Sequence, residues 1–417
     1  MLRRIKSVVG DFLPALRSYN YRLYFFGQSI SIIGWWMAAV AQQWLIYPTL
    51  TNDKSLLGII GFVSLFPTAA FVLLGGVVAD RINLRRGMII QQSLYMVTAF
   101  IMTALIITGR IAVWHVVISA LVNGIIFAFD IPTRQSLIIS LVPRHVIPSA
   151  LSLNAGIFNV GRALGSAAGG LIIATLGLGA AYGINGITFL AVIGGVMAMK
   201  LTNTRSTATQ ASLTGNFIEG LQYVRKHSAI ASILSLLFLA SVATWPIGTL
   251  LPVYAHDIFA LGEVGFGMLV SAYGIGAMLG AFGFSKLFET SPKKDGLLYT
   301  LAASVFFYVI AFAVSNAFVL SLILQIIGGF LVTSLIAFVN VSVQLDAPDT
   351  MRGRLLSFYS FVLMGGGPVG SLVASIGVVT LGPRYTLTVV ALVYALVSSI
   401  LIMKTRQHLQ EKFTAML

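Results

Sequence analysis

The sequence predicts an all-α membrane protein with twelve transmembrane helices, arranged as two parallel, pseudo-symmetric six-helix halves. Three observations support this prediction: the composition, the number of long apolar runs and an internal repeat. Hydrophobic residues make up 58% of the 417 residues and charged residues only 9%, and the mean hydropathy is +0.94. A soluble protein carries about a quarter charged residues. This chain has too few charges to cover a water-facing surface, so lipid must be part of its solvent.

The charges and the missing cysteines exclude several classes of protein. The net charge is +14, but the Lys and Arg residues lie at the ends of long apolar runs. This is the pattern of positive-inside membrane topology and not of a nucleic-acid surface. The lack of cysteine excludes disulfides and cysteine-ligated metals, and the five histidines are scattered. We therefore expect no metal, no cofactor and no nucleic-acid partner.

Twelve apolar runs are long enough to cross a bilayer, which takes about 20 residues in a helix. Their approximate limits are 21–47, 55–79, 87–108, 111–131, 147–176, 179–200, 229–256, 263–288, 296–315, 317–343, 354–381 and 384–403. An even number of spans places both termini on one side. The only basic residues that would then lie outside the cell are Lys54, Arg110 and Arg384, and Arg162 falls within a span. The other basic residues lie at the termini or in even-numbered loops, which predicts that both termini face the cytoplasm.

The longest loop joins spans six and seven and divides the chain into two halves. It covers residues 201–228, between an N-terminal half at 1–200 and a C-terminal half at 229–417. A polar stretch opens the loop, and an amphipathic segment closes it with an apolar stripe formed by Phe217, Leu221 and Val224. We expect this segment to form a surface helix at the cytoplasmic interface that links the halves.

An internal repeat relates the two halves. Six residues are each followed, 205 positions later, by a residue of the same type: Pro143, Ser152, Gly161, Gly165, Ser166 and Gly177. A second block has an offset of 207 and contains Gly58, Ser64 and Gly76. Each half contains six spans, so the halves have the same orientation. Parallel six-helix repeats are typical of a large transporter class whose substrate site lies near the midplane at the repeat interface.

The loop between spans two and three carries a recognisable motif. Residues 75–86 read GGVVADRINLRR, which resembles the cytoplasmic loop signature of the major facilitator superfamily. In that pattern the glycine lets two helices approach, and the aspartate and basic residues hold the cytoplasmic side closed. The resemblance implies a coupling or gating role for Gly76, Asp80, Arg81, Arg85 and Arg86. A plain positive-inside loop is the alternative; it explains the arginines at 85 and 86 but not the glycine and aspartate at this spacing.

Span five and several shorter segments narrow the resemblance to one branch of the superfamily. Residues 161–170, GRALGSAAGG, resemble its exporter signature, with Ser166 where a proline usually follows the second glycine. The small-residue face remains, so close helix packing is still expected. Further segments resemble the branch that contains the bacterial enterobactin (siderophore) and macrolide exporters: residues 20–28, 129–135, 141–144 and 250–255.

This resemblance implies the major facilitator fold and a function in the bacterial inner membrane. It implies efflux of a small amphipathic or anionic molecule, such as a siderophore or a drug, by a monomeric antiporter driven by the proton motive force. The expected partners are the small-molecule substrate, protons and the lipid bilayer. Many drug–proton antiporters carry an arginine in span four, four residues before a glycine. Here Ala120 stands at that distance before Gly124.

Spans one, four, seven and ten line the central cavity in this architecture, and polar or aromatic side chains recur along them at helical spacing. We expect the substrate cavity to contain Gln28, Trp35, Gln42, Asn123, Arg162, Trp245, Asn340 and Gln344. The intramembrane Arg162 can bind an anionic group of a substrate. Other roles are open: interhelical hydrogen bonds for the amides, packing or anchoring for the tryptophans, and pairing with backbone carbonyls or Asp130 for Arg162.

Asp130 and Arg134 complete the predicted coupling and gating residues. They are four residues apart on one helix, so they can pair. We place them near the cytoplasmic end of span four, where gating and proton transfer are both open. No carboxylate lies clearly at mid-membrane, and Asp130 is the best candidate for proton coupling.

The alternatives to an exporter are an importer or a lipid or lysophospholipid flippase of the same fold. A membrane enzyme would need a nucleophile–base set, a metal site or a phosphate loop, and the sequence has none of these signatures. A sensor would usually carry an added soluble domain. The sequence therefore predicts a transporter and not an enzyme.

Overall fold

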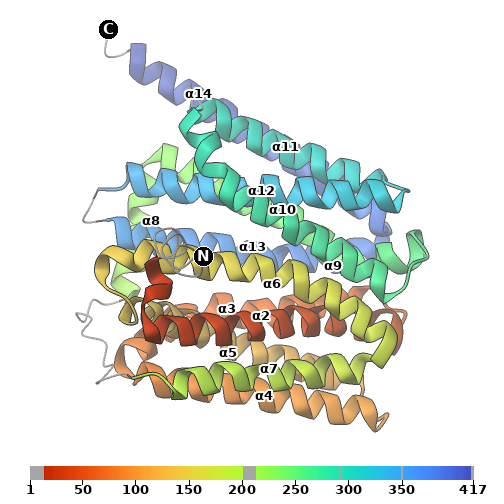
Figure 1. Ribbon diagram of the computed structural model, residues 1–417. Coiled ribbons are helices and arrows are strands. Elements are labelled where there is room, and N and C mark those ends of the chain that lie inside the picture. Colours follow the sequence, from red (N-terminus) through yellow and green to blue (C-terminus); the bar gives the residue numbers. More distant parts are fainter. Residues whose placement is uncertain (1–13, 201–212, 291–293, 349–350, 415–417) are drawn as a thin grey trace, which may run out of the picture. The chain divides into compact units, whose positions relative to one another are not determined.

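The structure is a computed structural model that describes residues 14–200, 213–290, 294–348 and 351–414, apart from some side chains in these ranges (Figure 1). Helices form nearly all of the regular structure in this part of the chain. Twelve of them are long and apolar enough to cross a membrane. This confirms the predicted all-α, multi-pass architecture.

The described helices follow one another in the order η1 (Pro14–Arg17), α2 (Tyr19–Trp44), η2 (Leu45–Leu50), α3 (Ser55–Arg81), α4 (Leu84–Ile107), α5 (Val113–Ser140), η3 (Arg144–Val146), α6 (Ile147–Leu176), α7 (Leu178–Met197), α8 (Leu213–Lys226), α9 (Ser228–Val253), η4 (Tyr254–Ile258), α10 (Glu263–Thr290), α11 (Lys294–Val314), α12 (Phe318–Asp346), α13 (Arg352–Thr380) and α14 (Pro383–Thr414). All but the short helices η1, η2, η3, η4 and α8 correspond to one predicted span each.

The fourth span is longer than predicted. The apolar run was expected to end near residue 131, but α5 continues to Ser140. The polar side chains do not end the helix because they face the protein: Asp130 is fully buried and Thr133 is 1% exposed. Asp130 therefore lies about 15 Å from the C-terminal end of the helix, at about 1.5 Å per residue. Its predicted place near the cytoplasmic end of the span stays a prediction.

The first compact unit comprises residues Met1–Leu50, Phe66–Thr209 and Leu261–Ser271. Within it α2 packs against α6 and α7, and α4 packs against α5 and α7. The small residues of α6 face α2: a Cβ atom added at Gly165 would lie 2.9 Å from the Cβ atom of Trp36. The close packing expected for span five is therefore present, with Ser166 fully buried at the position where a proline was usual.

A second close approach joins α3 to α5 in the same unit. A Cβ atom added at Gly75 would overlap the carbonyl oxygen of Ala128. Pro132 has no N–H group, so this carbonyl lacks its usual helical donor. Seven residues before Gly75, the hydroxyl of Thr68 donates to the carbonyl of Gly124 at 3.1 Å. The sequence predicts a close helix contact at Gly76, and in the structure the neighbouring Gly75 makes the approach to Ala128.

The second compact unit comprises residues Thr51–Leu65, Gln210–Ala260 and Ala272–Leu417. Within it α9 packs against α12, α13 and α14, and α11 packs against α12 and α14. The start of α3 lies on α13, where the hydroxyl of Ser375 donates to the carbonyl of Ser55 at 2.8 Å. The helix α8 also lies on α13 and is held there by an ion pair between Glu219 and Arg354.

The internal repeat is visible as the same contact in each unit. In the first unit, Gly267 at the start of α10, two residues after the repeat counterpart of Gly58, lies against the carbonyl oxygen of Ser166. In the second unit, Gly58 at the start of α3 lies against the carbonyl oxygen of Ser371. Ser166 and Ser371 are one of the pairs with the offset of 205. Each thus receives a glycine from the start of a helix, which agrees with the pseudo-symmetry inferred from sequence.

The amphipathic part of the predicted linker forms the helix α8. Val224 is 7% exposed, Leu221 is half-buried and Lys226 is exposed, which agrees with the stripe for the side chains described. The side chain of Phe217 and residues 201–212 lie outside the described part of the chain. The division into halves at residues 200 and 229 stays a prediction.

Candidate functional site

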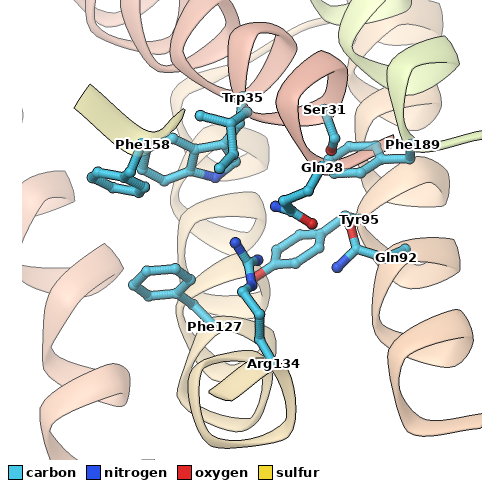
Figure 2. A pocket seen from close by; sticks show the side chains of 10 residues that line it. Gln28, Ser31, Trp35, Gln92, Tyr95, Phe127, Arg134, Phe158 and Phe189 are labelled. Atoms are coloured by element: carbon cyan, nitrogen blue, oxygen red, sulfur yellow. The ribbon is translucent and has the colours of Figure 1, made fainter. Parts of the chain in front are cut away.

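A recess in the first unit is lined by residues from five helices. The space between the lining side chains is about 340 Å³ when it is counted out to open solvent. The lining residues are Gln28, Ser31, Ile32 and Trp35 of α2, Gln92 and Tyr95 of α4, Phe127 and Arg134 of α5, Phe158 of α6 and Phe189 of α7 (Figure 2).

The α2 side of the recess follows from helical spacing. Its residues stand at positions i, i+3, i+4 and i+7, which fall on one face of a helix. Gln28 and Ser31 are each 2% exposed, although their polar groups lie in a span that is otherwise mostly apolar. Polar side chains avoid lipid because hydrocarbon cannot satisfy them. They are therefore directed to the interior, where they face the recess.

One wall of the recess is aromatic. Trp35 stacks on Phe127 with ring centroids 6.1 Å apart and planes at 17°, and the ring of Phe158 lies 6.0 Å from Trp35. Across α4 and α7, Tyr95 stacks on Phe189 at 5.5 Å. Aromatic faces at these distances offer large apolar area with little side-chain freedom to lose. The wall therefore fits a flat or apolar body of a ligand.

The other end of the recess is polar and incompletely paired. Figure 2 shows the head groups of Gln28, Tyr95 and Arg134 directed toward one another. Among the described residues, no hydrogen-bond partner is found for Gln28 Oε1, the Tyr95 hydroxyl or Arg134 Nε. A buried polar atom left unpaired costs about 1–3 kcal/mol. These atoms therefore provide sites for the polar atoms of a ligand.

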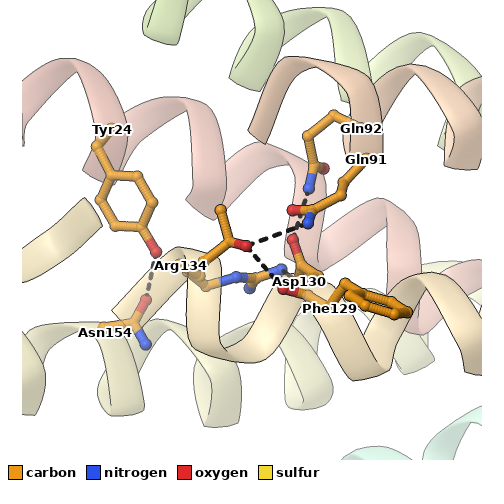
Figure 3. A network of polar contacts seen from close by, with 8 residues as sticks. Tyr24, Gln91, Gln92, Phe129, Asp130, Arg134 and Asn154 are labelled. Carbon is orange, nitrogen blue, oxygen red and sulfur yellow. Dashed lines mark hydrogen bonds and ion pairs between the residues drawn. The ribbon is translucent and has the colours of Figure 1, made fainter. Parts of the chain in front are cut away.

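Behind this polar end lies a buried carboxylate (Figure 3). Asp130 is fully buried; its Oδ1 accepts a hydrogen bond from Gln92 Nε2 at 3.0 Å, and its Oδ2 pairs with Arg134. Such a charge is tolerated in a low dielectric only when it is paired and hydrogen-bonded. The pairing predicted from the spacing of four residues is present.

Neighbouring polar contacts fix the surrounding helices. Gln91 Nε2 donates to the hydroxyl of Thr133 at 3.2 Å, which in turn donates to the carbonyl of Phe129 at 2.8 Å. The hydroxyl of Tyr24 donates to Asn154 Oδ1 at 2.7 Å and joins α2 to α6 (Figure 3). Hydrogen bonds thus join α5, the helix of Asp130 and Arg134, to α4. A separate hydrogen bond joins α2 to α6.

The predicted cavity residues are placed at different sites. Gln28 and Trp35 line the recess, and so does Arg134, which the sequence assigned to coupling. Gln42 and Asn123 are half-buried in the first unit but are not among the lining residues. Arg162 lies over the ring of Trp36, with its guanidinium carbon 4.6 Å from the ring centroid.

Three predicted cavity residues belong to the second unit. Trp245 is 42% exposed there, and Gln344 Nε2 donates to Asn340 Oδ1 at 2.6 Å. Their role in a substrate cavity stays a prediction.

The predicted gating loop is partly described. Arg85 donates to the carbonyl of Met197, the last residue of α7. The side chain of Asn83 accepts from the backbone N–H of Arg86 at 3.1 Å and caps α4. Gly76 is half-buried and Arg81 is exposed. The side chain of Asp80 lies outside the described part, so the charge cluster stays a prediction.

Sequence reasoning missed the contribution of α4. It considered spans one, four, seven and ten, whereas Gln92 and Tyr95 come from span three. Two adjacent amides and a tyrosine within a single apolar span form a signal that was present in the sequence. Phe158 and Phe189 carried no comparable signal, because an aromatic residue in a span is compatible with any packed position.

Two bacterial transporters are similar in sequence to this chain over most of its length. It is 26% identical over 348 residues to the multidrug efflux pump Tap of Mycolicibacterium fortuitum, covering 80% of this chain and 83% of that one. It is 25% identical over 366 residues to the staphyloferrin A transporter of Staphylococcus aureus, covering 85% and 88%. One relative is thus a drug efflux pump and the other a siderophore transporter, which agrees with the predicted branch.

The fold and the family follow from two further comparisons. A solved structure of a bacterial homologue of the human lysosomal transporter Spinster, inward-facing and unoccupied, superposes with a TM-score of 0.71 at 12% identity, covering 94% of this chain and 98% of that one. This likeness concerns the fold. The family model of the transmembrane secretion effectors matches residues 11–414. The chain belongs to this family of major facilitator transporters.

Proposed function

We propose that this transporter exports a small amphipathic or anionic molecule, of the siderophore or drug class, by alternating access driven by the proton motive force. The observation that carries the proposal is the recess, which joins an aromatic wall to a buried polar end. An amphipathic molecule has the same division between an apolar body and a polar group. The efflux pump and the siderophore transporter among the relatives support the same class of cargo.

Asp130 is the residue to which we assign proton coupling. Coupling needs a titratable group that the chain can shield from lipid and connect to the substrate site. Asp130 is fully buried and pairs with Arg134, which lines the recess. A change in its protonation therefore changes the charge balance directly behind the bound ligand.

The rigid parts needed for alternating access are provided by the helix contacts. Glycine and serine residues bring α6 onto α2, and α13 onto the start of α3, at backbone distance. Such surfaces are smooth and lack interlocked long side chains, so they suit bodies that move as units. We further propose that both termini face the cytoplasm of the bacterial inner membrane and that the protein acts as a monomer.

Transport into inverted membrane vesicles tests the proposal. Energised vesicles containing the protein are expected to accumulate a carboxylate siderophore or an amphipathic drug, and a protonophore is expected to abolish the accumulation. Vesicles without the protein control for passive entry. Accumulation indifferent to the protonophore would refute proton-motive coupling, and accumulation only in right-side-out vesicles would show import.

A matched pair of variants tests the role of Asp130. Asp130→Asn removes the buried carboxylate and keeps its shape, and it is expected to abolish accumulation against a gradient. Asp53→Asn serves as control, because Asp53 is exposed in the loop before α3 and its Oδ1 caps Ser55, which an asparagine oxygen also does. Unchanged accumulation by the Asp130 variant would exclude this residue as the coupling group.

A further inference from the structure

Three polar groups from three helices meet at the polar end of the recess. They belong to Gln28 of α2, Tyr95 of α4 and Arg134 of α5, and Figure 2 shows them directed toward one another. Gln28 is 2% exposed and Tyr95 is 6% exposed, and the side chain of Arg134 is 15% exposed. The surrounding helices therefore shield these groups almost completely from lipid and bulk water.

The three groups complement one another as donors and acceptors. The Nε–H group of Arg134 is a donor, Gln28 Oε1 is an acceptor, and the hydroxyl of Tyr95 is both. None of these three buried atoms has a hydrogen-bond partner among the described residues, so they do not bond to one another directly. Polar groups that face each other beyond bonding distance are often bridged by a water molecule. Without a bridge, each would bear the full cost of an unpaired buried polar atom.

The space in the recess fits one water molecule. Counted only where a water-sized sphere fits, this space is about 20 Å³, and a water molecule needs about 10–15 Å³ on that measure. A buried water molecule also needs about two to four polar partners. The polar end of the recess offers three. A transported substrate is larger, so its entry requires the lining helices to move.

From this geometry we infer that the polar end of the recess is a binding site for one ordered water molecule. The water oxygen accepts a hydrogen bond from Arg134 Nε, and one water hydrogen is donated to Gln28 Oε1. The hydroxyl of Tyr95 makes the third hydrogen bond. Three is the typical number for a buried water molecule. The water thereby joins α2, α4 and α5.

The bridge holds Arg134 at a second point. One terminal nitrogen of the guanidinium pairs with Asp130, and the water molecule binds Nε. The guanidinium is planar and rigid, so two fixed nitrogens determine its orientation. Gln28 and Tyr95 are therefore positioning residues, which act on the Asp130–Arg134 pair through the water molecule.

The bridge also gives Arg134 an acceptor that does not depend on Asp130. Under the proposed function Asp130 takes up and releases a proton, so the arginine is without its counter-charge for part of the transport cycle. A buried cation is tolerated only when its protons find acceptors. The water molecule provides one during that part of the cycle. This step rests on the proposed function, whereas the water site itself does not.

Radiolytic footprinting tests the site in the purified protein in detergent. X-ray pulses split water into hydroxyl radicals, which oxidise a buried tyrosine when a water molecule lies against it, and heavy-oxygen water marks the product for mass spectrometry. Tyr394 is the internal control, because it is 3% exposed and its hydroxyl donates to the carbonyl of Ala302 at 2.8 Å. We expect Tyr95 to be oxidised several-fold faster than Tyr394.

Two variants test the partners of the water molecule. Gln28→Leu removes the acceptor and nearly keeps the side-chain volume, so oxidation of Tyr95 is expected to fall about fivefold, as the loss of one hydrogen bond implies. Asp130→Asn mimics the protonated acid and is expected to leave oxidation of Tyr95 unchanged, because the bridge does not use Asp130. The comparison of Tyr95 with Tyr394 needs no variant, so the inference remains testable if either substitution prevents folding.

The outcomes distinguish the water site from the export function. Equal oxidation of Tyr95 and Tyr394 would overturn the site, and so would unchanged oxidation of Tyr95 in the Gln28→Leu variant. Loss of Tyr95 oxidation in the Asp130→Asn variant would overturn the independence of the bridge from Asp130. Export driven by the proton motive force would still stand after any of these results. Conversely, oxidation as expected in a protein whose vesicles accumulate no substrate would leave the water site intact and refute export.

Discussion

Gly75 of α3 lies directly over the backbone carbonyl oxygen of Ala128 in α5, the carbonyl that Pro132 leaves without a helical donor. The approach is close enough for the glycine Cα–H to contact this oxygen, and such contacts recur where helices meet at backbone distance. Asp130 lies only two residues further along α5. The contact therefore also fixes the position of the buried carboxylate along the axis of α3.

Gly75→Ala is therefore expected to destabilise the protein by about 1–3 kcal/mol, because a methyl group at this position overlaps backbone that cannot move independently. The measurement is the unfolding midpoint in detergent, followed by tryptophan fluorescence. Gly194→Ala is the control, since no atom lies within 4 Å of a Cβ atom added there. Equal midpoints for the two variants would contradict the close approach.

Removing one member of the Asp130–Arg134 pair is expected to have unequal effects. Arg134→Gln leaves a buried carboxylate without its counter-charge, which costs about 3–5 kcal/mol. Asp130→Asn keeps a neutral hydrogen-bonding group beside Gln92 and is expected to cost less. The double variant is expected to be more stable than Arg134→Gln alone, because the isolated charge is gone. Thermal unfolding of the three variants measures the coupling, and strictly additive losses would show that the pair does not interact.

Trp35→Ala is expected to weaken binding of a ligand with an aromatic body about tenfold, since an aromatic pair contributes about 0.5–1.5 kcal/mol beyond its buried area. Trp35→Phe retains a flat ring and is expected to recover most of the affinity. The control is Trp114→Ala, a tryptophan that is 59% exposed and lies outside the recess. Fluorescence titration cannot be compared directly when tryptophans are removed, so equilibrium dialysis with labelled ligand provides the measurement.

Arg85→Ala distinguishes two roles for the loop after α3. As a cap on the last carbonyl of α7, Arg85 stabilises the fold by about 0.3–1 kcal/mol, and its removal is expected to lower the unfolding midpoint slightly and to leave the transport rate nearly unchanged. As a member of the predicted gating cluster, its removal would lower transport with little loss of stability. Arg110→Ala, in an exposed loop outside this region, is the control for a lost surface charge.

Much of the architecture was predictable from the sequence because lipid imposes strict rules on composition. Spans and small-residue packing follow from hydropathy and from the spacing of glycines. The Asp130–Arg134 pair follows from helical geometry alone, since four residues place two side chains on one face. The signal for the amphipathic helix α8 was equally local, because its apolar stripe is visible within fourteen residues of sequence.

The remainder depended on tertiary contacts that periodicity does not contain. The extension of α5 beyond Pro132 requires that Asp130 and Thr133 find partners on α4, and these partners are not visible from α5 alone. The cap of α7 by Arg85 requires two segments more than a hundred residues apart to meet. The aromatic wall is the clearest case, because nothing in their local sequence separates Phe158 and Phe189 from aromatic residues that face lipid.

Part of the aromatic wall lies on helices that do not carry the buried pair, and this separation bears on how the family diversifies. Phe158 and Phe189 come from α6 and α7. Asp130 and Arg134 lie on α5, which also carries Phe127, and are supported from α4, which also carries Tyr95. A substitution on α6 or α7 can change which shapes of cargo fit without altering the charged centre. During evolution such a protein can thus acquire a new substrate by a few substitutions in the aromatic wall. The buried Asp130–Arg134 pair, and the coupling assigned to it, are then retained. Relatives that carry siderophores and relatives that expel drugs are then expected to differ first at the wall.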